Sequence, residues 1–465
     1  MCGFAGFFSP SSCDESILHL MAAALHHRGP DDQGVWTDAG LGIGFAHARL
    51  SILDLSSAGH QPMQSASDRY VIVFNGEIYN HLALRAELSI KGQAPSWRGN
   101  SDTETILAGF DTWGIDTTVS KMVGMFGLAV WDKKDLEITF IRDRMGEKPL
   151  YYGWQGNTFL FASELKAIKV HPLFNAKIDR DALASFVRHG YIPAPQSIYT
   201  GIKKLLPGNL IKISLGQPRD SKPEKYWSLV NVAYHATQMP FVGSDADAVD
   251  SLEAKLSESI AGQQLSDVPI GAFLSGGIDS STIVALMQAQ SFRPINTFTI
   301  GFNEKQYNEA RHAKSVAQHL GTDHTEYYVS SDEAQLVIPK LASLYDEPFS
   351  DSSQIPTFLV SQLAKKNVTV ALTGDAGDEL FGGYNRYNWM RKMLKVPAPM
   401  RSLLANGINS ISPKGWDQIY RCIVPVLPKG LNLPQFGDKV HKLASVLGMK
   451  SAGEVYKRVV SSWDN

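Results

Sequence analysis

Short apolar runs separated by turn residues fill the chain up to about residue 210. Runs of this length, bounded by glycine and polar residues, are typical of buried strands. The polar stretch 132–135 lies between two such runs and predicts a β-hairpin. The elements expected in this part are strands at 70–74, 126–131 and 137–141 and helices at 80–88 and 179–189.

After residue 245, helical and extended patterns alternate, and helical crossovers between apolar strands indicate a parallel, doubly wound sheet. The expected elements are helices at 246–263, 280–290 and 309–320 and strands at 270–274, 296–300, 325–329 and 368–372. Between the two parts, glycine, proline, serine and charged residues follow one another with little periodicity, as in a linker. We therefore expect a domain at 2–215, a linker at 216–244 and a second domain at 245–465.

The composition is that of a globular protein with balanced charge. Of 465 residues, 44% are hydrophobic and 19% charged, and 44 Lys and Arg residues nearly balance 46 Asp and Glu residues. This balance disfavours nucleic acid or an anionic membrane as the main partner. Three cysteines make no disulfide framework, and neither a signal peptide nor a membrane-length apolar run is found. We therefore expect a cytoplasmic protein.

Cys2 directly follows the initiator Met1. If Met1 is removed, one residue carries both a thiol and a free α-amine. Their ordinary pKa values lie near ~8.5 and ~8, so the amine can act as the base for its own thiol. The alternative is a small, apolar second residue without a chemical role. The motifs below favour a nucleophile.

The segment 275–280, Ser-Gly-Gly-Ile-Asp-Ser, lies between an expected strand and an expected helix. Its adjacent glycines, Gly276 and Gly277, let backbone N–H groups approach a phosphate, and the helix N-terminus adds partial positive charge. The Gly-Lys-Ser/Thr of a Walker A loop is missing. Alternatively, Asp279 or Ser280 caps the helix and the glycines form a turn. The order of strand, loop and helix favours phosphate binding.

A second polar segment, 373–379, follows the strand expected at 368–372. Ligands of open α/β sheets bind at the carboxyl ends of strands, so both polar segments should face one crevice. The alternative for 373–379 is an acidic helix start that the helix dipole favours. Two such segments on a compatible topology favour a nucleotide site.

From residue 1 to about 387 the chain resembles the glutamine-dependent asparagine synthetase family. Its N-terminal half is similar to a class II glutamine amidotransferase domain, which implies an αββα N-terminal-nucleophile hydrolase fold. The loop at 275–280 is similar to the pyrophosphate loop of the ATP pyrophosphatase superfamily, which implies ATP and Mg²⁺. The N-terminal segments that carry the resemblance are Met1-Cys-Gly-Phe-Ala-Gly6, His27-Arg-Gly-Pro-Asp31, Arg49-Leu-Ser-Ile52, Phe74-Asn-Gly-Glu-Ile-Tyr79, Ser101-Asp-Thr-Glu104 and Gly146-Glu-Lys-Pro-Leu-Tyr-Tyr152.

The resemblance implies that Cys2 attacks the side-chain amide of glutamine and gives a thioester and ammonia. The Asn75 side chain and the Gly76 N–H would form the oxyanion hole. Ammonia would then travel through an internal passage to an acyl-adenylate, where the new amide forms.

Further residues would bind glutamine. Arg49 would pair with the α-carboxylate and Asp102 with the α-ammonium group, with Glu77 nearby. Each also has an ordinary structural reading: a surface ion pair for Arg49, a turn at Asn75-Gly76 and an N-cap at Asp102. Their joint occurrence in the expected order favours the glutamine site. The expected glutamine-binding set is Arg49, Leu50, Ser51, Ile52, Leu53, Asn75, Gly76, Glu77 and Asp102.

In the second domain the resemblance implies that Phe273 and Leu274 lie beside the adenine or ribose. Ile300, ending the next strand, would contact the base. Asp279 and Asp378 would handle Mg²⁺ and pyrophosphate. The expected ATP-binding set is Phe273, Leu274, Ser275, Gly276, Gly277, Asp279, Ser280, Ile300, Thr373 and Gly374.

The chain departs from the family pattern at Asp375, where family members carry a Glu that is thought to act as a base in amide formation. Asp keeps the carboxylate but is shorter by one methylene, and a displacement of ~1 Å can cost about a hundredfold. The acceptor acid therefore stays open between aspartate, a sugar carboxylate of a surface polysaccharide and another small acid.

The second departure is at the end of the chain. The family continues to a Val-Pro-Phe-Leu-Asp stretch that nothing in 388–465 resembles, so we expect a C-terminally truncated product. The expected activity is glutamine-hydrolysing, ATP-dependent asparagine synthesis. A glutaminase with an impaired synthetase half and a nucleotide-binding regulator are the alternatives. We expect glutamine, ATP and aspartate as partners, neither nucleic acid nor a membrane, and leave a homodimer open.

Overall fold

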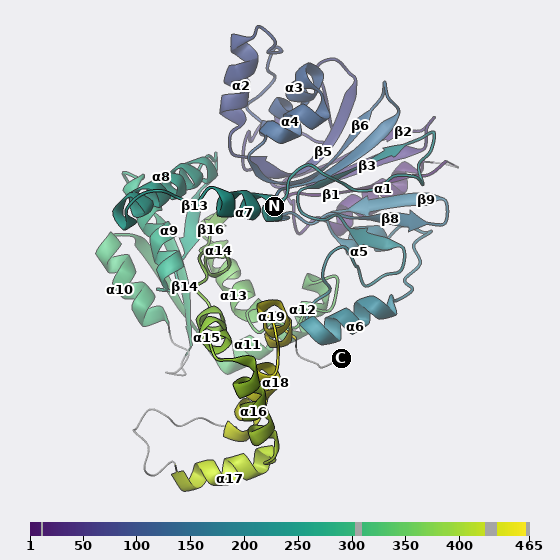
Figure 1. Ribbon diagram of the computed structural model, residues 1–465. Helices are drawn as coiled ribbons and strands as arrows, with labels where there is room; N and C mark the ends of the chain where they lie inside the picture. The colour runs from purple at the N-terminus through teal and green to yellow at the C-terminus, as the bar shows by residue number, and fades with distance from the viewer. Residues whose placement is uncertain (11–12, 303–308, 424–434, 462–465) are drawn as a thin grey trace. The chain divides into compact units, whose positions relative to one another are not determined.

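The computed structural model describes residues 1–10, 13–302, 309–423 and 435–461 (Figure 1). The chain divides into two compact units. The first comprises Met1–Ala184 and Ile192–Gly374, and the second comprises Ser185–Tyr191 and Asp375–Asn465.

Antiparallel sheets stack face to face in the first 227 residues. One sheet has the strand order β10-β8-β9-β1-β3-β2, and the other has the order β12-β11-β7-β6-β5-β4. Their facing side chains form a core that includes Phe4, Phe45, Val73, Trp131 and Phe140. The strands are β1 (Gly3–Phe8), β2 (Asp32–Asp38), β3 (Ile43–Arg49), β4 (Met63–Gln64), β5 (Tyr70–Ile78), β6 (Gly124–Asp132), β7 (Glu137–Arg142), β8 (Tyr151–Gln155), β9 (Thr158–Ala162), β10 (Ile202–Lys204), β11 (Asn209–Ser214) and β12 (Glu224–Lys225).

Helices cover both outer faces of this sandwich, so the expected αββα layering is confirmed (Figure 1). Helices α1 and α5 pack on the sheet of β1, and α3 packs on the sheet of β5. The second core, between α3 and its sheet, includes Tyr70, Phe74, Ile106 and Phe110. The helices of this part are α1 (Glu15–Ala24), α2 (His81–Ile90), α3 (Asp102–Trp113), α4 (Ile115–Lys121), α5 (Leu165–Lys169) and α6 (Arg180–His189).

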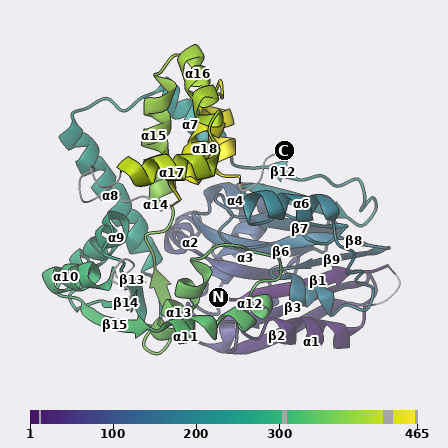
Figure 2. The same cartoon turned by 90° about the horizontal axis from the view of Figure 1, so that it is seen from below.

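A parallel sheet with the order β15-β14-β13-β16 follows. Helices α9 and α10 pack on one face around Val284 and Ala313, and α13 packs on the other around Ala364 (Figure 2). The expected doubly wound sheet is confirmed. Its elements are α8 (Asp245–Gln263), β13 (Ile270–Phe273), α9 (Ile278–Ala289), β14 (Asn296–Phe302), α10 (Ala310–Leu320), β15 (Asp323–Val329), α11 (Ser331–Gln335), α12 (Ile338–Leu344), α13 (Gln354–Ala364) and β16 (Val370–Leu372).

The second unit is helical in its described residues. Its core contains Met393, Ala405, Ala444, Leu447 and Val455, which come from four different helices. The helices that lie wholly in this unit are α14 (Gly377–Phe381), α15 (Asn385–Leu394), α16 (Ala398–Asn409), α17 (Pro413–Ile423), α18 (Phe436–Leu447) and α19 (Ala452–Val459).

Two local features differ from the expectations. The segment expected as an irregular linker contains β12 and a helix, α7 (Leu229–Gln238), whose side chains are all at least partly exposed. Strand β14 runs to Phe302, so Ile300 lies two residues before the strand end rather than at it. The strand extends past Ile300 because β14 stays paired with β15 as far as the pair Phe302 and Val329.

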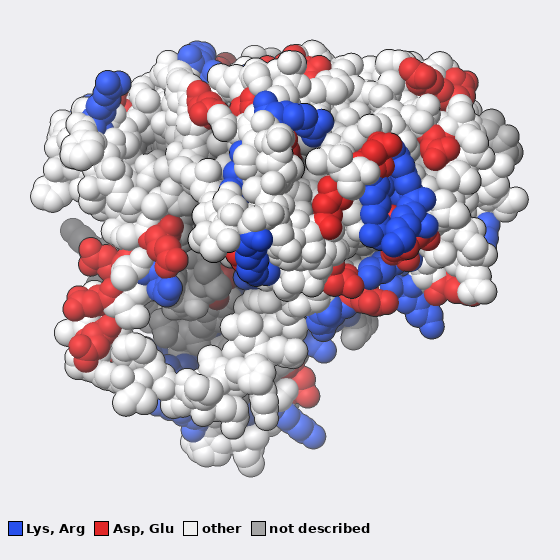
Figure 3. Space-filling view, turned by 90° about the horizontal axis from the view of Figure 1, so that it is seen from above, with Lys and Arg blue, Asp and Glu red and all other residues white. Residues whose placement is uncertain are grey.

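On the face seen in Figure 3, Lys and Arg side chains lie interspersed with Asp and Glu. Among the described residues, no helix is long and apolar enough to cross a membrane.

Candidate active site

The thiol of Cys2 lies beside the backbone of Leu50. Strand β1 pairs with β3 so that Gly3 lies opposite Ala48. This pairing brings Cys2, just before β1, next to Leu50, just after β3. Leu50 N donates to Cys2 Sγ at 3.3 Å, and the thiol donates to Leu50 O at 3.4 Å. Burial raises the pKa of the thiol, so it needs a base to become a nucleophile.

The chain's α-amine, here on Met1, lies in the same buried region. Burial, together with the nearby Arg28 and Lys148, lowers the pKa of this amine from 8.0 to about 6. An amine with this pKa is mostly uncharged at neutral pH and can accept a proton. Removal of Met1, which would give Cys2 the free amine, stays a prediction.

Asn75 lies inside β5 with its side chain fully buried. Neither atom of its amide has a hydrogen-bond partner in the described part of the chain. A buried polar group without a partner costs about 1–3 kcal/mol, so such a group points to a ligand or to a catalytic role. The alternative of an ordinary turn at this position is wrong, because β5 continues through it.

The backbone N–H of Gly76 points away from the neighbouring strand. Gly76 lies opposite Phe126 in the pairing of β5 with β6. Phe126 makes its backbone bonds on its other side: Phe126 N donates to Asp143 Oδ2 at 3.1 Å, and Asp143 N donates to Phe126 O at 2.8 Å. Opposed residues of an antiparallel pair exchange either both backbone hydrogen bonds or none. Because Phe126 directs its N–H and carbonyl to Asp143, Gly76 exchanges none with it, and the Gly76 N–H faces the outer edge of β5.

The neighbouring backbone N–H groups along that edge donate hydrogen bonds to side chains. Phe74 N donates to Gln61 Oε1 at 2.7 Å, and Ile78 N donates to Asp102 Oδ2 at 2.9 Å. Between them, no acceptor for the Gly76 N–H is found among the described residues. A free backbone donor therefore lies next to the unbonded side-chain amide, as an oxyanion hole requires.

Arg49 ends β3 and is held by backbone carbonyls. Its Nη1 donates to Ser56 O at 2.9 Å, and its Nη2 donates to Leu53 O at 3.5 Å and to Asp54 O. The guanidinium packs against Gly59 and is only 6% exposed, which rules out a surface ion pair. Within the described residues no carboxylate pairs with it. A buried guanidinium without a counter-ion suits the carboxylate of a ligand.

Asp102 and Glu77 provide negative charge in the same region. Burial raises the pKa of Asp102 to about 6. Burial and the neighbouring Asp102 raise the pKa of Glu77 to about 7, and its Oε1 is buried without a partner among the described residues. The N-cap of α3 is Ser101, which accepts from Thr103 N, so the capping alternative for Asp102 is wrong.

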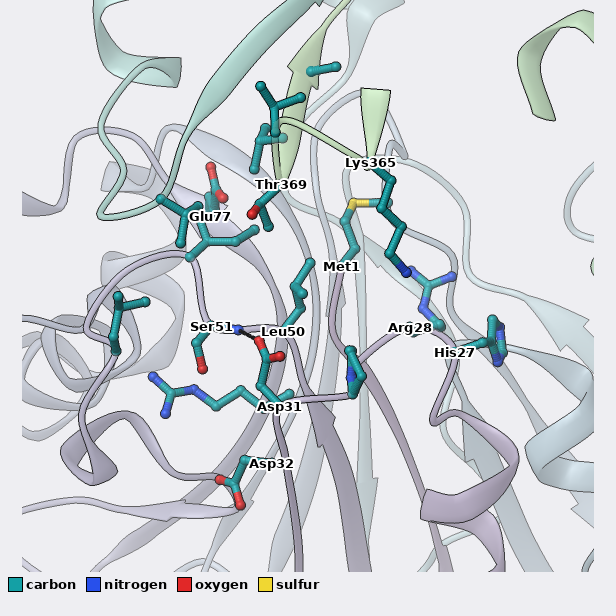
Figure 4. Close-up of a pocket in the computed structure, with 18 of the residues that line it drawn as sticks. Met1, His27, Arg28, Asp31, Asp32, Leu50, Ser51, Glu77, Lys365 and Thr369 are labelled. Carbon is teal, nitrogen blue, oxygen red and sulfur yellow. Dashed lines mark hydrogen bonds between the residues drawn. The ribbon is translucent and has the colours of Figure 1, made fainter. Parts of the chain in front are cut away.

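These groups line one small cavity of about 40 Å³. A larger cavity of about 1310 Å³ shares part of its wall, including Leu50, Met125 and Glu77, and extends to Phe273 and to residues 368–371 of the parallel sheet. Figure 4 shows Leu50, Ser51, Thr369 and Lys365 among the residues that line this larger cavity. Within the first unit, the thiol region and the parallel sheet therefore border one open space.

The loop between β13 and α9 has the geometry of an anion site. Its N-cap residue is Gly277, and no side chain caps the first turn of α9, so the alternative of a cap by Asp279 or Ser280 is wrong. Gly276 adopts φ +79°, a conformation that glycine tolerates best. The Ser275 and Ser280 hydroxyls lie 2.9 Å apart and brace the loop. The uncapped N–H groups stay available to a phosphate.

Gly374 follows β16 and touches the start of α9. A Cβ added to it would lie 2.7 Å from Ser280 N and 2.9 Å from the carbonyl carbon of Asp279. The ends of β13 and β16 thus meet at the loop, as expected from neighbouring parallel strands. Thr373 lies beside Gly374 and is half-buried.

Comparison with known proteins assigns the two halves. The model of a glutamine amidotransferase domain matches residues 1–227, and that of asparagine synthase matches residues 251–465. A putative asparagine synthetase (glutamine-hydrolyzing) 2 of Methanocaldococcus jannaschii is 37% identical over 422 residues, which cover 85% of this chain and 79% of that protein. This chain belongs to the glutamine-hydrolysing asparagine synthetase family. The resemblance stated from the sequence motifs is confirmed, and so is the expected class of carbon–nitrogen ligases with glutamine as amide donor.

Asparagine synthetase (glutamine-hydrolyzing) 1 of Bacillus subtilis is 35% identical over 424 residues, covering 89% of this chain. The chain spans 64% of that relative's length, less than two thirds. Glutamine phosphoribosylpyrophosphate amidotransferase from B. subtilis, a solved structure, has a TM-score of 0.37 and 16% identity over 70% of this chain and 65% of that chain, a similarity too low to bear on function.

The remaining predicted site residues of this synthetase-family chain are distributed as follows. Phe273 is half-buried and lines the larger cavity. Leu274 packs in the core of the parallel sheet, so its side chain is not exposed to a ligand. Ile300 is half-buried within β14. Asp375 and Asp378 belong to the second unit and Asp279 to the first, so their joint action on Mg²⁺ stays a prediction.

Sequence reasoning missed several residues that line or support the cavity beside Cys2. Lys148 is buried, lines both cavities and has its Nζ 2.6 Å from Met1 Sδ. Gln61 and the buried His47 hold Phe74, the residue before Asn75; His47 Nε2 lies 3.0 Å from Phe74 O. Lys148 lies in a segment that carries the family resemblance, which was a usable signal. Gln61 and His47 lie in no pattern that marks them.

Proposed function

We propose that this protein hydrolyses glutamine at Cys2 and uses the ammonia to convert aspartate to asparagine, with cleavage of ATP to AMP and pyrophosphate. One observation carries the proposal. The Cys2 thiol, the unbonded Asn75 amide and the unpaired Arg49 guanidinium line a single cavity. This cavity shares its wall with a larger one that reaches the parallel sheet.

The glutamine half follows from this geometry. After removal of Met1, the α-amine of Cys2 takes the thiol proton, and the thiolate attacks the amide carbon of glutamine. The Asn75 amide and the Gly76 N–H donate to the oxygen that becomes negative, and each such donor contributes about 3–4 kcal/mol to the transition state. The amine returns the proton to the leaving nitrogen. Ammonia departs, and water cleaves the thioester to glutamate.

Charge complementarity orients the substrate. Arg49 binds the α-carboxylate through its planar fork, since it has no other anionic partner among the described residues. Asp102 and Glu77 bind the α-ammonium group, which also keeps their carboxyl groups ionised. The substrate's side chain is thereby directed at Cys2.

The larger cavity is the proposed route for ammonia. Leu50, Ile52 and Met125 are apolar parts of the wall that the two cavities share. Ammonia is small and uncharged, so an apolar passage excludes competing ions better than it excludes ammonia. The far side of the larger cavity is lined by Phe273, which ends β13 just before the phosphate loop, and by Val370, which begins β16.

The ATP half rests on the uncapped N-terminus of α9. The pyrophosphate of ATP would accept from the loop's backbone N–H groups, and the hydroxyl of Ser281, buried without a partner in the described residues, lies in the first turn. No group of three or more potential metal ligands gathers in the described residues. Mg²⁺ often has one or two carboxylates and the substrate's phosphates as ligands, so Asp279 fits this role, with Asp378 as the proposed second carboxylate. The metal would neutralise the leaving pyrophosphate.

The acceptor, location and assembly are parts of the same proposal. Aspartate is the proposed acceptor because the relatives' names specify asparagine, and Asp375 is the proposed base for amide formation. A cytoplasmic location follows from the cysteine usage. A homodimer is proposed without a specific interface.

One assay tests the proposal. Glutamine, Mg²⁺-ATP and aspartate are supplied, and glutamate, asparagine and pyrophosphate are followed separately. We expect all three products, and we expect Cys2→Ala to abolish glutamine use while ammonia still supports asparagine formation. Glutamate without aspartate-dependent pyrophosphate would reduce the protein to a glutaminase. Failure to make glutamate would contradict the glutamine half.

A further inference from the structure

Every polar atom of Asp54 takes part in a hydrogen bond. It adopts φ +58°, which is uncommon for a residue other than glycine, so its surroundings must hold it. Its carbonyl accepts from Arg49 Nη2. Its carboxylate accepts from Ser56 N at 3.0 Å and from Asn100 N at 2.7 Å. The position of the Arg49 guanidinium therefore depends on the conformation of Asp54.

The remaining polar atom of Asp54 is held from the other domain. Asp54 N donates to Asp267 Oδ2 at 2.8 Å, and Asp267 N donates to Ile52 O at 3.0 Å. The partners are 213 positions apart in the chain. Two bonds thus fix the loop 50–56 to the segment that enters β13, the strand that ends at the phosphate loop.

The segment around Asp267 is itself attached to the parallel sheet. Pro269 O accepts from Thr369 N at 3.0 Å, at the start of β16, and Val268 lines the larger cavity. The carboxylate of Asp267 therefore has a defined place relative to the strands. A charged acceptor of this kind makes a hydrogen bond about twice as strong as a neutral one.

We propose that Asp267 is a positioning residue through which the synthetase domain sets the glutamine-binding arginine. The carboxylate holds Asp54 in its left-handed conformation, and Asp54 holds Arg49 where the α-carboxylate of glutamine binds. The inference rests on the proposed glutaminase activity. It assigns control of glutamine affinity to a residue outside the domain that hydrolyses glutamine.

The test uses the full chain with Asp267→Ala, Asp267→Asn and, as a matched control, Asp250→Ala. Asp250 is an exposed residue of α8 whose side chain has no hydrogen-bond partner among the described residues. Asp267→Ala removes the acceptor and is expected to raise the KM for glutamine about tenfold, with kcat within about twofold, because the reacting groups are untouched. Asp267→Asn keeps an acceptor oxygen and is expected to lie within about threefold of the parent KM. Asp250→Ala is expected to match the parent.

A second readout separates positioning from general loss of structure. Glutamine should protect Cys2 from alkylation by iodoacetamide, and the half-protecting concentration should rise about tenfold in Asp267→Ala, while the alkylation rate without glutamine stays the same. An unchanged KM and an unchanged half-protecting concentration would overturn the inference. The inference would also be overturned if Asp267→Ala lowered ammonia-driven activity as much as glutamine-driven activity and lowered the melting temperature as well, because the residue would then be merely structural. If the parent protein itself does not hydrolyse glutamine, the proposed function fails instead.

Discussion

Replacement of Gly59 by alanine tests the assignment of Arg49 directly. Gly59 ends a short 3-10 turn, Ser57–Gly59, and its φ is not positive, so alanine is acceptable to the backbone. The added Cβ would lie 1.9 Å from Arg49 Nη2, 2.6 Å from Cζ and 3.1 Å from Nη1. The three nearest atoms all belong to the far end of one long side chain, so we expect the guanidinium to move and the fold to persist.

The size of the movement sets the size of the effect. Normal contact between carbon and nitrogen needs about 3.4 Å, so the 1.9 Å approach requires Nη2 to shift by about 1.5 Å. A displacement of about 1 Å in a positioning group can cost about a hundredfold, which corresponds to about 2.7 kcal/mol. The loss should appear in the KM for glutamine. Some of the carbonyl bonds of Arg49 weaken as well, at about 1 kcal/mol each, which lowers the melting temperature by a few degrees.

The assay measures initial rates of glutamate formation over a range of glutamine concentrations, and ammonia-driven pyrophosphate formation in parallel. Gly40→Ala is the matched control, because among the described residues its Cβ would meet only Asp38 Oδ1, at 3.7 Å. We expect a KM for glutamine about a hundredfold higher in Gly59→Ala, with ammonia-driven synthesis unchanged. A Gly59→Ala protein that folds and binds glutamine like the parent would refute the role of Arg49.

Three further changes probe the other parts of the mechanism. Asn75→Ala removes one oxyanion donor and should lower kcat for glutamine about 100- to 1000-fold with little change in KM, measured by steady-state glutaminase kinetics. Because the pKa values of Glu77 and Asp102 are raised to about 7 and about 6, both carboxyls are charged only above these values. The KM for glutamine should therefore rise as the pH falls through this range, by up to about tenfold per unit between about 7 and 6 and by up to about a hundredfold per unit below about 6, where both carboxyls take up protons. A flat KM profile between pH 8 and 5 would remove both from ammonium binding. Gly374→Ala would place its Cβ 2.7 Å from Ser280 N, at backbone that cannot yield cheaply, so ammonia-driven pyrophosphate formation should fall at least tenfold while glutaminase activity persists.

Elements with a strong local pattern were predictable from the sequence. The apolar run at 70–74 became β5, and the alternation after residue 245 became the parallel sheet with its helices, although boundaries moved by a few residues. The candidate oxyanion residues Asn75 and Gly76 could also be picked out from the sequence, because their neighbours form a recognisable motif. In each case the signal lies within a few consecutive residues.

Contacts between distant segments were not predictable. The fit of Gly59 against Arg49, the bond from Phe74 N to Gln61 and the helix α7 in the expected linker depend on tertiary packing. The same holds for the Asp54–Asp267 bond. A lone glycine or aspartate in a loop has no periodicity to mark it, and its role exists only once two remote segments meet.

We expect that the glutaminase and synthetase reactions can be disturbed separately, because few residues take part in both proposed sites. Gly59→Ala acts on the guanidinium of Arg49 and Gly374→Ala acts on the backbone at α9, and the two glycines lie in different domains of the first unit. Suppose that each variant loses only its own half-reaction. Any dependence of glutamine affinity on the synthetase domain would then pass through direct contacts between that domain and the glutaminase domain. The bonds of Asp267 to the loop 50–56 are contacts of this kind, because Asp54 in that loop supports Arg49, the proposed glutamine-binding residue. Combining Asp267→Ala with Gly59→Ala should then add little to the KM of Gly59→Ala alone, since both act on the same guanidinium. Multiplicative effects would show that Asp267 acts by another path.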